Sequence, residues 1–109
     1  MVNKSPRMTL PTQLVLQALL KDPGRESYGV EIADSAGLPS GTVHPILARI
    51  EGMGWVESRW EDIDPRKVGR PARRYYRLTA DGEESVRTAL ARAYRPTRAP
   101  FFQPIPGQA

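Results

Sequence analysis

The sequence has no cysteine and only one histidine, and this composition excludes several kinds of covalent, metal and catalytic site. Without cysteine there is no disulfide, no thiolate ligand for zinc and no cysteine nucleophile. The one histidine, His44, lacks a second imidazole or thiolate with which to hold a transition metal. We therefore expect neither a metal ion nor any other cofactor.

Catalytic signatures and long apolar runs are missing as well. Ser27, Ser40 and Ser58 have no base and orienting acid at a recognisable spacing, and there is no glycine-rich phosphate loop, so we expect no enzyme. The longest apolar runs are a few residues, far short of the roughly 18 that a membrane helix needs. The basic first residues lead into no apolar leader segment. We interpret the protein as cytoplasmic, with no membrane contact.

The chain is 109 residues long, which favours one compact domain. Sixteen Lys and Arg against twelve Asp and Glu give a net charge of +4. The positive charge is concentrated between residues 65 and 78, a stretch without any acid that follows a more acidic one. A basic cluster of this kind is more often a solvated surface than a polyanion site, so its meaning depends on the fold around it.

Hydrophobic periodicity predicts three helices in the first half of the chain. The first begins after Thr9 as cap and runs to about Lys21; its apolar residues cover more than one face, which favours packing against both the core and a second subunit. A turn over 22–26 precedes a short helix with Ser27 as cap and Gly37 as its stop. We expect the third helix to start late, with Thr42 as cap, because Pro45 is not compatible with a helix interior. Gly54 ends it.

The second half predicts a hairpin and one more helix. Residues 55–61 alternate as a half-buried strand with Val56 and Trp60 on one side, residues 62–72 form a loop, and residues 73–78 form a second strand. Thr79 caps the last helix, which ends near Arg95. We interpret Tyr28, Trp55, Trp60 and Tyr76 as core residues. The expected organisation is a flexible arm (1–8), a folded domain (9–95) and a proline-rich tail (96–109), disordered unless Phe101 and Phe102 dock on a surface.

The fold class is therefore mainly α with a small β-hairpin (α+β), in the order α-α-α-β-wing-β-α of a winged helix-turn-helix domain. In such a domain the third helix enters the major groove of DNA, which is about 12 Å wide. The small residues Gly41, Ala48 and Gly52 on its outer face permit a close approach of the backbone. The candidate DNA-binding residues are Ser40, Thr42, His44 and Arg49 for phosphates or base edges, and Arg66, Lys67, Arg70, Arg73 and Arg74 for phosphates beside the hairpin.

Four segments together resemble the PadR family of transcriptional regulators. They are 28–32 (Tyr-Gly-Val-Glu-Ile), 40–51 with its Thr-Val-His-Pro-Ile-Leu centre, 54–56 (Gly-Trp-Val) and 69–79 (Gly-Arg-Pro-Ala-Arg-Arg-Tyr-Tyr-Arg-Leu-Thr), followed by Gly82. The resemblance spans most of residues 10–90, and it implies a homodimeric repressor that binds a partly palindromic double-stranded DNA operator.

Two departures from the family pattern alter what the resemblance implies. His44 stands where the family usually has a tyrosine that helps to grip the DNA backbone. The chain also has one helix and a tail where many members have a larger C-terminal dimerisation domain, so dimerisation falls to the first and last helices and a small-molecule effector is doubtful. The alternative function is a winged-helix module for protein–protein interaction, with secondary DNA contact.

Overall fold

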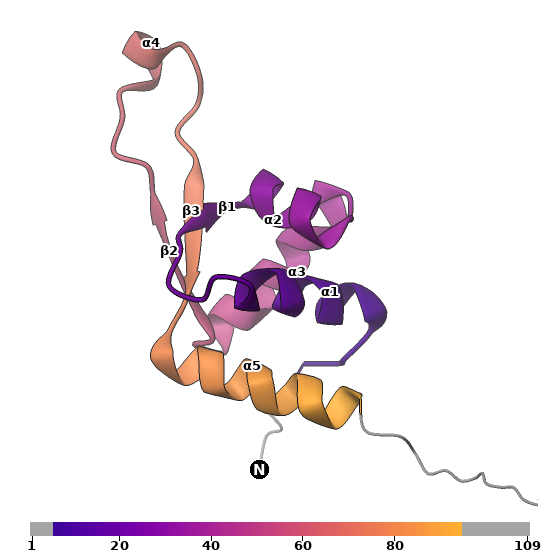
Figure 1. Cartoon of the computed structure of the whole chain (residues 1–109). Helices are drawn as coiled ribbons and strands as arrows, with labels where there is room; N and C mark the ends of the chain where they lie inside the picture. Colours follow the sequence, from indigo (N-terminus) through magenta and orange to yellow (C-terminus); the bar gives the residue numbers. More distant parts are fainter. Residues whose placement is uncertain (1–5, 95–109) are drawn as a thin grey trace, which may run out of the picture.

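The computed structural model describes residues 6–94, which form a group of helices, a small sheet and a projecting hairpin (Figure 1). Helices α1 (Leu10–Leu20), α2 (Gly29–Ala36) and α3 (Ser40–Gly52) pack together, and α5 (Ala80–Ala93) lies across α1. The core between them comprises Val15, Leu16, Leu19, Ile32, Ala33, Val43, Ile46, Leu47, Ile50, Val86 and Leu90. The winged helix-turn-helix arrangement expected from the sequence is confirmed.

The cap of the first helix is as expected from the sequence, whereas the residues before it differ from the expectation. Thr9 caps α1, and its Oγ1 accepts a hydrogen bond from the Thr12 amide. Residues 6–8 belong to the arm that the sequence predicts to be flexible, but they lie against the domain. Pro6 is buried, Met8 packs on the core, and the Met8 carbonyl accepts a 2.8 Å hydrogen bond from Gln13 Nε2. The expectation for Phe101 and Phe102 falls outside the described residues.

The predicted start of α2 is wrong. Ser27 is not its cap, because Ser27–Tyr28 forms a short strand, β1, and the helix begins at Gly29. The Tyr28 amide donates instead to the Glu31 carboxylate at 3.2 Å. A pair of residues has no periodicity, so nothing in the local sequence distinguished this strand from a cap. Gly37 ends the helix with a φ of 71°, as expected.

The start of α3 differs from the prediction as well. The helix begins at Ser40 with Pro39 as its N-cap, so Thr42 is not the cap and Pro45 lies inside the helix. Pro45 has no amide to donate to the Gly41 carbonyl one turn earlier. Gly41 and Pro45 are both exposed, and this carbonyl is therefore on the side of the helix that water reaches. An exposed early turn tolerates the lost bond better than a buried helix interior would.

The sheet has three antiparallel strands in the order β1-β3-β2. Strand β3 (Arg74–Leu78) pairs with β2 (Val56–Trp60) in a register that places Val56 opposite Leu78 and Trp60 opposite Arg74. Tyr28 of β1 lies opposite Tyr75. The sheet therefore ties the turn before α2 to the base of the hairpin.

The hairpin projects beyond the helices, and this corrects two expectations (Figure 1). Trp60 is not a core residue: it is 61% exposed, because no helix covers this end of β2. The connection between the strands contains a short helix, α4 (Pro65–Val68), whose N-cap is Asp64 and whose stop is Gly69 with a φ of 85°. The other proposed core aromatics differ among themselves, since Trp55 and Tyr76 are buried and Tyr28 is half-buried.

Helix α5 is joined to the rest of the domain by a close contact. Thr79 caps it, with Oγ1 accepting from the Gly82 amide and donating to the Gly54 carbonyl, both at 2.8 Å. A Cβ atom added to Gly82 would lie 1.8 Å from the Trp55 carbonyl oxygen, so only glycine permits this approach. No helix within residues 6–94 is long and apolar enough to span a membrane.

Candidate nucleic-acid interface

The outer face of α3 is composed of small and polar residues. Val43, Ile46, Leu47 and Ile50 are buried, and this leaves the opposite side exposed, as the periodicity predicted. Exposed on this side are Gly41, His44, Pro45, Ala48, Arg49 and Gly52. No described residue covers this face with a bulky side chain, so another surface can approach the helix backbone closely. The predicted Ser40 is exposed at the first turn, and Thr42 is half-buried at one edge.

One edge of this face is fastened to the hairpin. Ser58 of β2 donates to the Glu51 carboxylate at 2.5 Å and accepts from Arg74 Nε at 3.0 Å. Arg74 also lies 3.6 Å from the same carboxylate oxygen, Oε2 of Glu51. The three residues come from α3, β2 and β3, so together they fix the direction in which the hairpin leaves the helix. We call them the hairpin clamp.

Arg70 has a structural partner within the hairpin. Its two terminal nitrogens donate to the two Glu61 oxygens at 2.7 and 2.9 Å, and the Arg73 amide donates to the same carboxylate at 3.2 Å. The Arg70 hydrogen bonds are the main cause that lowers the pKa of Glu61 to about 2. The pair closes the connection that carries α4 and holds its two ends together.

Aromatic rings hold further arginines against the sheet. The Arg73 guanidinium lies 4.4 Å from the centre of the Tyr28 ring, and that of Arg74 lies 5.1 Å from the centre of the Trp60 ring. Arg59 lies 5.4 Å from the Tyr75 ring centre and forms a bidentate ion pair with Glu26, which lowers the pKa of that carboxyl. These contacts restrict the arginine side chains without removing their positive charge.

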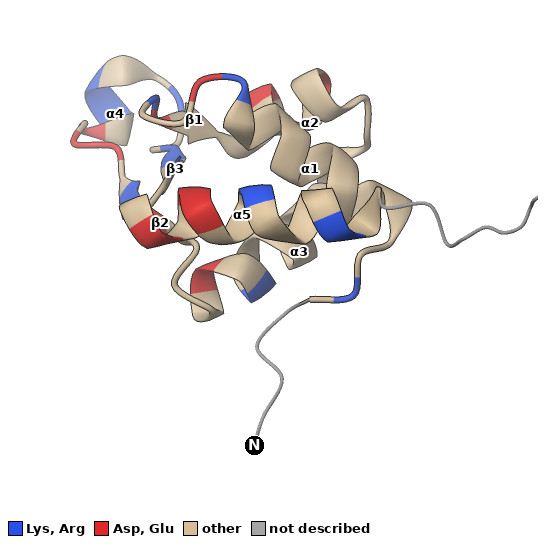
Figure 2. Ribbon diagram, turned by 60° about the horizontal axis from the view of Figure 1, so that its bottom comes forward, with Lys and Arg blue, Asp and Glu red and all other residues tan. Residues whose placement is uncertain are grey.

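The predicted cations therefore fall into two groups. Within residues 6–94, Arg70 and Arg74 form ion pairs with acids, whereas Arg49, Arg66, Lys67 and Arg73 form none. Arg66 and Lys67 are exposed on α4, the part of the hairpin farthest from the other helices (Figure 1). Figure 2 shows α4 with the blue of Lys and Arg. The acids Asp62 and Asp64 precede them, and Asp64 is occupied in part by the Arg66 amide at 3.0 Å.

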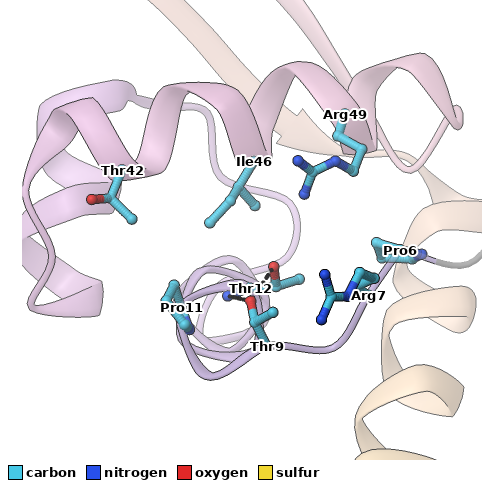
Figure 3. A pocket seen from close by; sticks show the side chains of 8 residues that line it. All are labelled: Pro6, Arg7, Thr9, Pro11, Thr12, Thr42, Ile46 and Arg49. Atoms are coloured by element: carbon cyan, nitrogen blue, oxygen red, sulfur yellow. Dashed lines mark hydrogen bonds between the residues drawn. The ribbon is translucent and has the colours of Figure 1, made fainter.

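A groove of about 500 Å³ lies along the other edge of α3 (Figure 3). It separates α3 from the segment that leads into α1, and it is lined by Pro6, Arg7, Thr9, Pro11, Thr12, Thr42, Ile46 and Arg49. The side chains of Arg7 and Arg49 both point into the space between the two elements. Neither arginine forms an ion pair with a described residue.

Sequence reasoning missed Arg7, Glu51 and Ser58. Arg7 precedes the first periodic segment, so no pattern connects it with α3. Glu51 and Ser58 flank the turn between α3 and β2, and their separation of seven residues is consistent with a contact across that turn. A Glu–Ser pair at this spacing is too common to indicate one without the fold.

The chain is similar to a known protein family and to solved structures. The model of the family described as "Transcriptional regulator PadR-like family" matches residues 15–88. No curated protein matches the chain. A PadR family transcription regulator from Clostridium difficile R20291 has a similar structure with a TM-score of 0.59 and 25% identity, over 77% of this chain and 86% of that one.

Two structures of AbfR are similar as well. AbfR of Staphylococcus epidermidis matches with a TM-score of 0.60 and 25% identity over 81% of this chain and 54% of its own. A structure described as reduced AbfR bound to DNA matches with a TM-score of 0.58 and 27% identity, over 83% of this chain and 59% of that one. This chain thus spans less than two thirds of the length of AbfR. The family match covers most of the domain, including α3 and the hairpin, and the chain belongs to the PadR-like family of transcriptional regulators.

Proposed function

We propose that this protein is a sequence-specific, double-stranded DNA-binding regulator of transcription, acting as a homodimeric repressor at a partly palindromic operator. The observation that carries the proposal is the exposed outer face of α3, where small residues surround the donors His44 and Arg49. A helix with side chains is about 10–12 Å across, and the major groove is about 12 Å wide, so such a face fits the groove. AbfR, whose structure is similar, is described in a complex with DNA, and this supports DNA binding by the present chain.

The hairpin supplies contacts that do not depend on sequence. Arg66 and Lys67 on α4 are exposed cations without acidic partners among the described residues, and we propose that they neutralise phosphates beside the groove. Arg73 stays a candidate for the same role. Arg70 and Arg74 stay candidates too, but their ion pairs with Glu61 and Glu51 indicate a larger contribution to the shape of the hairpin.

Exposed apolar residues on α1 and α5 support the dimer. Leu10 is 65% exposed in the first turn of α1, and Tyr94, directly after α5, is 57% exposed. The two helices pack against each other and run in opposite directions, so both residues lie at the same end of the pair (Figure 1). Covering them with a second copy removes apolar surface from water and sets two α3 helices in one assembly. If the two half-sites lie on the same side of the duplex, their centres are about 10 bp apart.

The test begins with a duplex selected by the wild-type protein from a random library. Fluorescence anisotropy then measures affinity for that duplex and for a scrambled one over a series of salt concentrations. The proposal predicts a clear preference for the selected duplex and a salt-dependent affinity for both. Equal affinity for selected and scrambled duplexes, or binding that does not change with salt, contradicts it.

The cations of the hairpin are tested in the same assay. Replacing Arg66 and Lys67 by Gln is expected to weaken binding to the selected and scrambled duplexes by the same factor, with a smaller dependence on salt. Arg87→Gln is the matched control, because this exposed arginine already pairs with Glu83 on α5, away from the hairpin. A loss confined to the selected duplex would instead assign the hairpin to base recognition.

A further inference from the structure

The groove between α3 and the segment before α1 concentrates positive charge. Arg7 and Arg49 point into it, and none of its eight lining residues is an acid. Two guanidinium groups that share a space without an anion repel each other, and each retains donors for hydrogen bonds. An anion placed between them satisfies both.

Helix α1 adds to this positive potential. Its N-terminal end borders the groove through Thr9, Pro11 and Thr12, and its first turn contains no acidic residue. The positive end of the helix dipole therefore has no carboxylate from its own first turn to offset it. The two arginines come from other segments, so three separate sources of positive potential converge on one groove.

The position of the groove relative to the hairpin indicates which anion it takes. Residues of an α-helix are about 100° apart around the axis, so Thr42 at the groove and Glu51 in the hairpin clamp, nine positions apart, lie on opposite edges of α3. A helix in the major groove lies between the two sugar–phosphate strands. If the hairpin follows one strand, the Arg7–Arg49 groove faces the other.

We propose that this groove binds a phosphate of the DNA backbone, held between the Arg7 and Arg49 guanidinium groups, on the strand opposite to the one that the hairpin contacts. This inference rests on the proposed function and deepens it. It adds Arg7 to the DNA-binding surface, and it assigns Arg49 to the backbone rather than to a base edge. Because Arg7 follows Pro6, which is buried, the inference also makes the packing of this segment a condition for full affinity.

The test compares Arg7→Gln and Arg49→Gln with wild type on the selected and scrambled duplexes. Each variant is expected to lose about the same factor in affinity on both, with the salt slope reduced by about one for a lost phosphate contact. Arg92→Gln is the control, since Arg92 is exposed in the last turn of α5 and has no partner among the described residues. Thermal unfolding of the four proteins checks that each variant keeps the wild-type fold, which we expect because the substituted side chains are exposed.

A duplex series with one backbone phosphate at a time replaced by a neutral methylphosphonate identifies the site. At one position on one strand, the neutral phosphate is expected to weaken binding by wild type but to have no effect on binding by Arg7→Gln, which already lacks that contact. At a position on the other strand, it is expected to weaken binding by wild type but not by the Arg66→Gln/Lys67→Gln variant. If Arg7→Gln retains the full affinity and salt slope while the hairpin variant loses both, the inference is overturned and the proposed function stands. If wild type binds no duplex, the proposed function fails.

Free phosphate is the other source of the same chemical group. Inorganic phosphate is titrated into wild type and Arg7→Gln, each without DNA, at constant ionic strength, and the backbone amide shifts of residues around the groove are followed by NMR. Shifts that saturate only at many millimolar, together with the methylphosphonate result, support a backbone contact. Saturation below a millimolar, with DNA affinity unaffected by Arg7→Gln, would make the groove a free-anion site and overturn the inference.

Discussion

At the scale of single residues, Thr79 and Gly82 join the last helix to the rest of the domain. The Thr79 cap, the Gly54 carbonyl and the Gly82 amide form one chain of hydrogen bonds that joins α5 to the turn after α3. At Gly82 the backbone approaches Trp55 so closely that a side chain has no space. The identity of this residue follows from tertiary contact, although its local conformation is ordinary helix.

Replacing Gly82 by Ala is expected to lower the free energy of unfolding by about 3 kcal/mol, because the new methyl group overlaps the Trp55 carbonyl and the helix must shift. Gly52→Ala is the control: this helical glycine has open space around it, so alanine is expected to leave stability equal or raise it by up to about 1 kcal/mol. Urea unfolding measures both. Equal stability of Gly82→Ala and wild type would contradict the close contact.

The Glu61–Arg70 pair predicts a pH dependence. Because Arg70 lowers the pKa of Glu61 from its usual 4.5 to about 2, the ionised carboxylate favours the folded state. This stabilisation is fully present above about pH 4.5 and is lost as the pH falls towards 2. Wild type is therefore expected to be more stable than Glu61→Gln at pH 7, with the difference disappearing by about pH 2. A difference that does not change with pH would show that the pair has no such role.

At the scale of elements, the relation between α3 and the hairpin decides whether both reach one duplex. The hairpin clamp connects them through the Ser58 hydroxyl, which lies between the Glu51 carboxylate and Arg74, and through the direct ion pair of Glu51 with Arg74. Trp60 and α4 have no support from the helices, so the direction of the hairpin depends on the clamp and on the pairing of β3 with β1 and β2.

Ser58→Ala is expected to reduce stability by only about 1 kcal/mol, since one net hydrogen bond contributes about that much, while the tip of the hairpin becomes more mobile. Amide ¹⁵N relaxation is expected to show larger-amplitude motion in residues 62–72 than in wild type. Thr88→Ala, at an exposed position of α5, serves as the control. Unchanged relaxation in the hairpin would mean that strand pairing and the Glu51–Arg74 ion pair fix its direction without the Ser58 hydroxyl.

Elements defined by local pattern were predictable, and those defined by tertiary pairing were not. The buried stripe of α3 and the caps Thr9 and Thr79 follow from spacing and side-chain chemistry, and the structure confirms them. Strand β1 exists only because β3 passes beside Ser27–Tyr28. Trp60 alternates in phase with buried Val56, but burial requires a covering helix, which alternation does not reveal.

In the candidate site, too, the residue types were predictable from the sequence and their tertiary contacts were not. The cations of the hairpin were visible as charge, but their partners were not: the sequence does not show that Glu61 holds Arg70 while Arg66 and Lys67 have no acid. The sequence also could not identify Arg7, because its proximity to α3 depends on the path of the chain before α1.

At the scale of the whole molecule, the proposed binding to a palindromic operator requires a dimer of this chain. Leu10 and Tyr94 are the exposed apolar residues at the shared end of α1 and α5. Leu10→Asp is expected to convert the dimer to monomers, because it places a charge in an apolar contact, without loss of helix content. Val30→Asp, at a comparably exposed position of α2, is expected to leave the dimer intact. Light scattering at micromolar concentration decides, and a monomeric wild-type protein would contradict the dimer.

The central claim is that the outer face of α3 lies in the major groove, and Ala48 is on this face. The most direct measurement is the affinity of Ala48→Glu for the selected duplex, beside Ser35→Glu, which adds the same charge at an exposed position near the end of α2. We predict at least a hundredfold weaker binding for Ala48→Glu on every duplex, with wild-type stability, and a much smaller effect for Ser35→Glu. Wild-type affinity in a folded Ala48→Glu protein would contradict the account.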